Sequence, residues 1–152
     1  MSGSDLAARL GEAASKLITV IERVQPDRWS AVPAPGVWSI GKEAEHVADA
    51  GAYHQWIVRQ TIGEKVGSRR PPIERQRMTS ALTPSEVIDQ IKRRTDEGIH
   101  LITALTDAQL DLPTKPPRAR NERLAETIQR VLIGHYDLHR EEIEAKLAAD
   151  SA

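Results

Sequence analysis

The amino-acid sequence predicts an all-α protein folded as a four-helix bundle. Apolar residues recur with helical spacing over four long segments, and two of these segments begin with clear N-cap sequences, at Ser39 and Thr83. No segment shows the sustained alternation or the hairpin sequences that are typical of β-strands. A chain of 152 residues can bury a core of its own. We therefore expect one domain over residues 1–152.

The first two predicted helices lie in the N-terminal half of the chain. In residues 5–24 apolar side chains recur every three or four positions, and Pro26 ends the pattern. The segment "QPDRWSAVPAPGVW" is rich in proline and is expected to form a loop. A second helix is expected to begin after Ser39 and to continue to about residues 61–62, just before Gly63.

The remaining two helices follow a long connection. Thr83 as N-cap, Pro84 at the first helical position and Glu86 in a capping box mark the start of the third helix, which is expected to reach about Leu105. A fourth helix is expected over about residues 121–146. Roughly 20 residues separate the second helix from the third, a length that allows a crossover along the bundle instead of a tight turn.

Composition excludes several classes of protein. The chain is 39% hydrophobic and 28% charged, with a formal net charge of −1, which argues against recruitment of nucleic acid or of a membrane surface. No leader-like segment and no apolar run of transmembrane length is present, so a cytoplasmic protein is expected. The sequence has no cysteine. Any metal ion must therefore be held by histidine and carboxylate, and any reactive thiol must belong to a cofactor or substrate.

Two histidines near the C-terminus are spaced as metal ligands often are. His135 and His139 lie one helical turn apart in "GHYDLHREEI", on the same broad face as Ile128 and Val131. This spacing allows two imidazoles to reach one ion. The alternative is a pair of polar side chains that are satisfied by water or by carboxylates.

A third histidine would strengthen the metal interpretation. His46 lies two turns into the second helix, at the border of its apolar face. A single helical histidine is more commonly an ordinary core or surface residue, and that alternative stays open. His54 and His100 have no supporting context.

Two motifs and their order along the chain carry a family resemblance. "WSIGKEAEH" spans Trp38 to His46, and "HYDLHREEI" spans His135 to Ile143, with Glu142 where glutamine is more usual. With the intervening "LITALTDAQLD", these motifs make the whole chain resemble the DinB superfamily of DinB/YfiT-like metalloenzymes. The resemblance implies a bundle with an up-down-down-up course. It also implies a divalent ion held by His46, His135 and His139.

The implied ligand set has the character of a catalytic site. Three neutral imidazoles leave coordination positions for water or substrate, and Zn²⁺, Ni²⁺, Fe²⁺ and Mn²⁺ all accept such ligands. Glu142 is the candidate catalytic residue, since one turn beyond His139 it can orient an imidazole, accept a proton or coordinate the ion; the alternative is a surface carboxylate. Asp49, one turn after His46, is a weaker candidate for orienting a metal-binding imidazole. Trp38 is expected to pack where its helix begins.

The resemblance favours an enzyme that acts on a small molecule. Family members with assigned chemistry include transferases and isomerases that depend on a low-molecular-weight thiol, and a metal-hydroxide hydrolase would need the same ligands. Arg118 or Arg120 would then bind a substrate carboxylate. The alternative is a non-catalytic, stress-associated metal-binding or interaction protein.

The sequence also favours a homodimer. Trp56 is expected to lie opposite the core-facing strip of the second helix, which would leave an apolar surface for a second copy. Relatives in the family that the chain resembles are frequently homodimers. The alternative is that the long connection after Gly63 covers Trp56.

Overall fold

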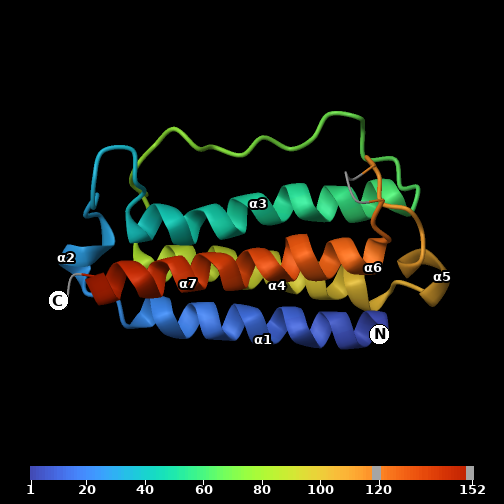
Figure 1. The fold of residues 1–152 in the computed structure, drawn as a ribbon, viewed down its shortest axis with the longest axis horizontal. Helices are drawn as coiled ribbons and strands as arrows, with labels where there is room; N and C mark the ends of the chain where they lie inside the picture. Colours follow the sequence, from blue (N-terminus) through green and yellow to red (C-terminus); the bar gives the residue numbers. More distant parts are fainter. Residues whose placement is uncertain (118–120, 150–152) are drawn as a thin grey trace.

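Four long helical segments packed side by side form the protein (Figure 1). The structure, a computed structural model, describes residues 1–117 and 121–149, and over these residues it has helices but no β-strand, as predicted. The elements are α1 (Gly3–Glu22), α2 (Pro26–Trp29), α3 (Ile40–Thr61), α4 (Pro84–Thr103), α5 (Asp107–Leu110), α6 (Leu124–Thr127), the π-helix η1 (Ile128–Ile133) and α7 (Gly134–Ala149).

Local capping determines where the helices begin. The Ser39 hydroxyl accepts a hydrogen bond from the Lys42 N–H at 3.1 Å, so α3 begins where the sequence predicts. At α4 the predicted capping box is present: Thr83 accepts from the Glu86 N–H at 3.2 Å, and the Glu86 carboxylate accepts from the Thr83 N–H at 3.1 Å. The first helix starts slightly earlier than predicted because Ser2 forms its cap.

Contacts between helices show how α3, α4 and α7 run relative to one another. Gly51 of α3 lies against the Arg94 side chain of α4, and Gln55, one turn later, lies against Gly98, so α3 and α4 run the same way. Near the end of α7, Lys146 donates to the Trp38 carbonyl just before α3, so α7 runs antiparallel to α3. The first half of α3 therefore lies beside α7.

The final helical segment is not one regular α-helix. The sequence predicts a single helix over residues 121–146, but the helix begins at Leu124 and contains the π-helical segment Ile128–Ile133. A π-turn holds one more residue than an α-turn, and hydrophobic periodicity does not show where such a residue is inserted. The π-helical segment ends at Ile133, and α7 begins at Gly134, directly before His135.

The long connection runs along the bundle beside α3, as the green to yellow-green trace at the top of Figure 1 shows. Trp56 is 8% exposed, and its indole N–H donates to the carbonyl of Gly67 at 3.1 Å. The connection thus covers Trp56, and the expectation that Trp56 offers an apolar surface to a second copy is wrong. No helix in residues 1–117 and 121–149 has the length and apolarity needed to cross a membrane.

A buried lysine fixes the other end of this connection. Lys42 of α3 is 1% exposed, and its ammonium donates to the Glu74 carbonyl at 3.0 Å and to the Glu74 carboxylate at 2.5 Å. The Trp38 indole N–H donates to the carbonyl of Arg75 at 3.3 Å. A buried ammonium needs such partners, so the connection is held against α3.

Replacing Glu74 by Gln is expected to loosen the connection, because the buried ammonium of Lys42 loses its ionised partner. We expect trypsin to cut residues 62–83 several-fold faster in Glu74→Gln than in the wild-type protein, with helix content unchanged by circular dichroism. Glu64→Gln is the matched control. Glu64 lies in the same connection but pairs with Arg59 at the surface, where an ion pair contributes little. Equal cleavage rates in the two variants would contradict the prediction.

Candidate metal centre

Three histidines from two helices meet between α3 and α7. The Nε2 atom of His135 lies 3.2 Å from Nε2 of His46 and 2.9 Å from Nε2 of His139. His46 is 3% exposed and His139 is 7% exposed, while His135 is half-buried. The three histidines that the resemblance selected are therefore neighbours, with their Nε2 atoms directed at one another.

A buried carboxylate holds one of these imidazoles. Nδ1–H of His139 donates to Glu43 Oε2 at 2.5 Å, and the other oxygen of Glu43 accepts from the Lys146 ammonium at 2.6 Å. Because Nδ1 carries the proton in this bond, the Nε2 lone pair of neutral His139 faces His46 and His135.

Glu43 lies one turn before His46 on α3 and was not predicted to take part in the site. The sequence predicted two other carboxylates near the ligands, Glu142 and Asp49. Glu142 is at the rim: its carboxylate lies 3.2 Å from Nδ1 of His139 and its side chain is 45% exposed. Asp49 lines a separate groove with residues of α4 and does not line the cavity that holds the histidines.

Burial keeps the imidazoles of His46 and His135 neutral. It is the main cause that lowers the pKa of His46 to about 4 and that of His135 to about 2, and the nearby cationic groups lower both further. For Glu43 burial alone would raise the pKa, but hydrogen bonds from His139, Glu142 and Lys146 outweigh burial and lower the pKa to about 2. The site therefore combines neutral imidazoles at His46 and His135 with an ionised carboxylate at Glu43, and metal ligands require imidazoles to be neutral and carboxylates to be ionised.

The Nε2 arrangement fits a divalent cation better than hydrogen bonding alone. Neutral His135 carries at most one proton on Nε2, so it cannot form linear hydrogen bonds to both His46 and His139. Ligand nitrogens with bonds of about 2.0–2.1 Å to one ion lie roughly 3 Å apart, close to the separations seen here. The buried Nδ1 atoms of His46 and His135 have no hydrogen-bond partner among the residues described. A cation at the point where the three Nε2 lone pairs meet would bind the Nε2 atoms of His46, His135 and His139 together.

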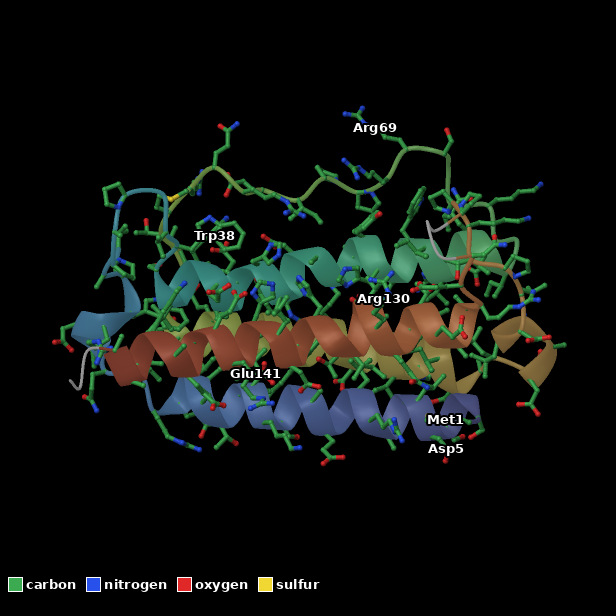
Figure 2. The ribbon with its side chains drawn as sticks, viewed as in Figure 1. Met1, Asp5, Trp38, Arg69, Arg130 and Glu141 are labelled. Carbon is green, nitrogen blue, oxygen red and sulfur yellow. The ribbon has the colours of Figure 1, made fainter. Side chains whose placement is uncertain are left out.

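The histidines open into a cavity of about 1030 Å³ between α3, α7 and the long connection. Trp38 packs on the ring of His46, with centroids 4.8 Å apart, and the ring of His54 packs edge-on against His135 at 4.9 Å. His54 is buried here, although no role was predicted for it. Figure 2 shows two of the lining residues, Trp38 between α3 and the long connection and Arg130 between α3 and the final helix. Arg118 and Arg120, suggested as carboxylate-binding residues, lie outside the described residues.

Comparison with protein families agrees with this arrangement. The family model described as the DinB superfamily matches residues 9–143, which include all three histidines. The chain belongs to the DinB superfamily. No curated protein and no solved structure matches the chain.

The metal-free DinB-superfamily chain is expected to lose stability as the pH falls below about 6.5. An unfolded histidine takes up a proton near its ordinary pKa of 6.5, whereas folded His46 does so only near pH 4 and His135 only near pH 2. Between these values the unfolded state binds more protons, so the free energy of unfolding decreases with decreasing pH. Below about pH 4.5, protonation of unfolded Glu43 adds to the effect.

Urea denaturation at a series of pH values measures this dependence. His135→Gln removes one group that binds a proton only after unfolding, so between pH 6 and pH 4 we expect the slope of stability against pH to decrease by up to about one proton per molecule. An unchanged slope in His135→Gln would contradict the prediction that folded His135 stays neutral in this pH range.

Proposed function

We propose that this protein is a divalent-metal-dependent enzyme that acts on a small molecule, with His46, His135 and His139 as the metal ligands. The observation that carries the proposal is the convergence of three Nε2 atoms, 2.9 and 3.2 Å apart, on a cavity of about 1030 Å³. A purely structural metal is usually closed off by four protein ligands, whereas a catalytic metal keeps positions open to substrate. Zn²⁺, Ni²⁺, Fe²⁺ and Mn²⁺ are the candidate ions.

Three residues near the ligands, Glu43, Lys146 and Glu142, have roles in the proposed mechanism. A bound ion would act as a Lewis acid that lowers the pKa of a coordinated thiol or water molecule. Glu43 fixes the tautomer and the orientation of His139, and Lys146 keeps Glu43 in place. Glu142 is the proposed catalytic residue: it lines the cavity and accepts or returns the substrate proton.

The reaction that we propose is transfer of a group to or from a low-molecular-weight thiol. The cavity is at the upper end of the range for small-molecule sites, about 300–1000 Å³, so it has room for a thiol cofactor together with a second substrate. The chain has no cysteine that would compete with this thiol for the metal or for the substrate. Hydrolysis is the second candidate reaction, since it uses the same ligands. A non-catalytic metal-binding or interaction protein is the alternative function.

We also propose a homodimer in the cytoplasm. Trp56 is already covered within the protomer, so it does not support a dimer interface. The proposal of a homodimer therefore rests on the frequency of homodimers among family members.

Protein purified without an affinity tag is expected to contain close to one equivalent of a divalent metal, measured by elemental analysis. His135→Ala should lose most of this metal, because only two imidazoles remain. The free energy of unfolding of the metal-free protein should change by no more than about 1–2 kcal/mol, since the core of the bundle does not depend on the ion. His100→Ala is the control, since His100 is exposed on α4 and should leave the metal content unchanged. Loss of most helical signal when the metal is chelated would show a structural metal instead.

Turnover is expected in a screen that combines the metal-loaded protein, several cellular thiols and electrophilic acceptor substrates. Glu142→Gln should lower kcat by about 100-fold while metal content stays at the wild-type level, because the amide cannot accept a proton. Glu141→Gln is the matched control, an exposed neighbour that pairs with Arg140 at the surface. A metal-loaded protein without turnover on any thiol or hydrolysable substrate would favour the non-catalytic alternative.

A further inference from the structure

Among the residues that the structure describes, three cationic side chains line the cavity, and two of them are already paired. The Arg130 guanidinium donates to both oxygens of Glu122, at 2.5 and 3.0 Å, and the Lys146 ammonium donates to Glu43 at 2.6 Å. Arg75 forms no ion pair with any carboxylate in residues 1–117 and 121–149. It is therefore the cation of this cavity that remains available to a bound molecule.

The backbone of Arg75 is held in place by neighbouring groups. Its carbonyl accepts a hydrogen bond from the Trp38 indole at 3.3 Å. The preceding residue, Glu74, is bound by the buried ammonium of Lys42, and Glu74 Oε1 accepts the backbone N–H groups of residues 76–77 at 2.7 and 3.0 Å. This compact turn presents the Arg75 side chain to the cavity without using its guanidinium.

Arg75 and the candidate metal ligands face the same space. Arg75 lines the cavity that His46 and His135 also line. A molecule that is bound beside these imidazoles can therefore reach the side chain of Arg75.

Exposed apolar side chains lie at the same cavity. Val37 is 37% exposed and Leu138 is 50% exposed, two of the few large apolar side chains of the described chain that are left open to solvent, and both line the cavity. Ile73 lines it as well, two residues before Arg75. An apolar part of a ligand would cover these side chains and remove their surface from water.

We propose that Arg75 binds the carboxylate of a substrate whose apolar part lies against Val37 and Leu138. This inference rests on the proposed function for the reaction itself, and it adds the substrate class, which is an organic monocarboxylate with an apolar body. The planar guanidinium matches one carboxylate with two parallel hydrogen bonds. A phosphate dianion would need a second cation, but Arg130 and Lys146 are engaged by carboxylates.

Binding of hexanoate to the metal-free protein at pH 8 tests the proposal, with hexanamide as the uncharged probe of the same length. Chemical-shift changes in the indole N–H signal of Trp38 report binding, since Trp38 lines the cavity and contacts the backbone of Arg75. Arg75→Ala should weaken hexanoate binding about tenfold and leave hexanamide binding unchanged, since loss of charge-assisted hydrogen bonds affects only the carboxylate. Arg77→Ala is the matched control, an exposed arginine two residues away that does not line the cavity.

Several results would overturn the proposal: hexanoate that does not bind the wild-type protein, equal hexanoate affinity in Arg75→Ala and wild type, or an equal loss in Arg77→Ala. Tighter binding of inorganic phosphate than of hexanoate would overturn the carboxylate assignment. Because the titration uses metal-free protein, its outcome is independent of the proposed enzyme activity. Metal content of Arg75→Ala should equal that of the wild type, and a variant that loses the metal would mark Arg75 as a structural residue.

Discussion

The candidate site depends on a buried carboxylate at the start of α3. Glu43 is 3% exposed and ionised, so it needs compensating partners inside the bundle. The final helix supplies two of them, Lys146 near its end and His139 two turns earlier. These bonds fix the position of α7 along α3. They thereby place His135 and His139 opposite His46, which is one turn beyond Glu43.

The residue beside Glu43 organises the opposite side of the cavity. Lys42 carries a buried ammonium and holds Glu74 of the long connection, while Glu43 holds α7. Two adjacent residues of one helical turn therefore position both the imidazoles and the segment that carries Arg75. A charge is costly to bury without a partner, so each of these pairs specifies which segment packs against α3. The fold and the site share these constraints, because the same turn of α3 determines both.

Features encoded locally could be predicted from the sequence, and features that depend on distant contacts could not. The caps at Ser39 and Thr83 involve neighbours within three residues, so the starts of α3 and α4 were predicted correctly. The burial of Trp56 depends on the path of the connection, which periodicity does not encode. Spacing and family resemblance indicated the three histidines. Glu43 was missed because an acidic residue in the first turn of a helix is ordinarily explained by the helix dipole, and its partner Lys146 is distant in the sequence.

The two carboxylates near His139 have opposite environments, and this difference separates their roles. Glu43 is buried, accepts hydrogen bonds from His139 and Lys146, and has a lowered pKa, so it remains an acceptor throughout. Glu142 lies at the rim of the cavity, where partial burial and then its hydrogen bond and charge interaction with Glu43 raise its pKa. When neighbouring acids have pKa values that are driven apart, one serves as a fixed charge and the other exchanges protons. Because Glu43 already orients the imidazole, Glu142 is not needed for that role, and its half-exposed carboxylate lines the cavity where the proposed proton transfer would take place.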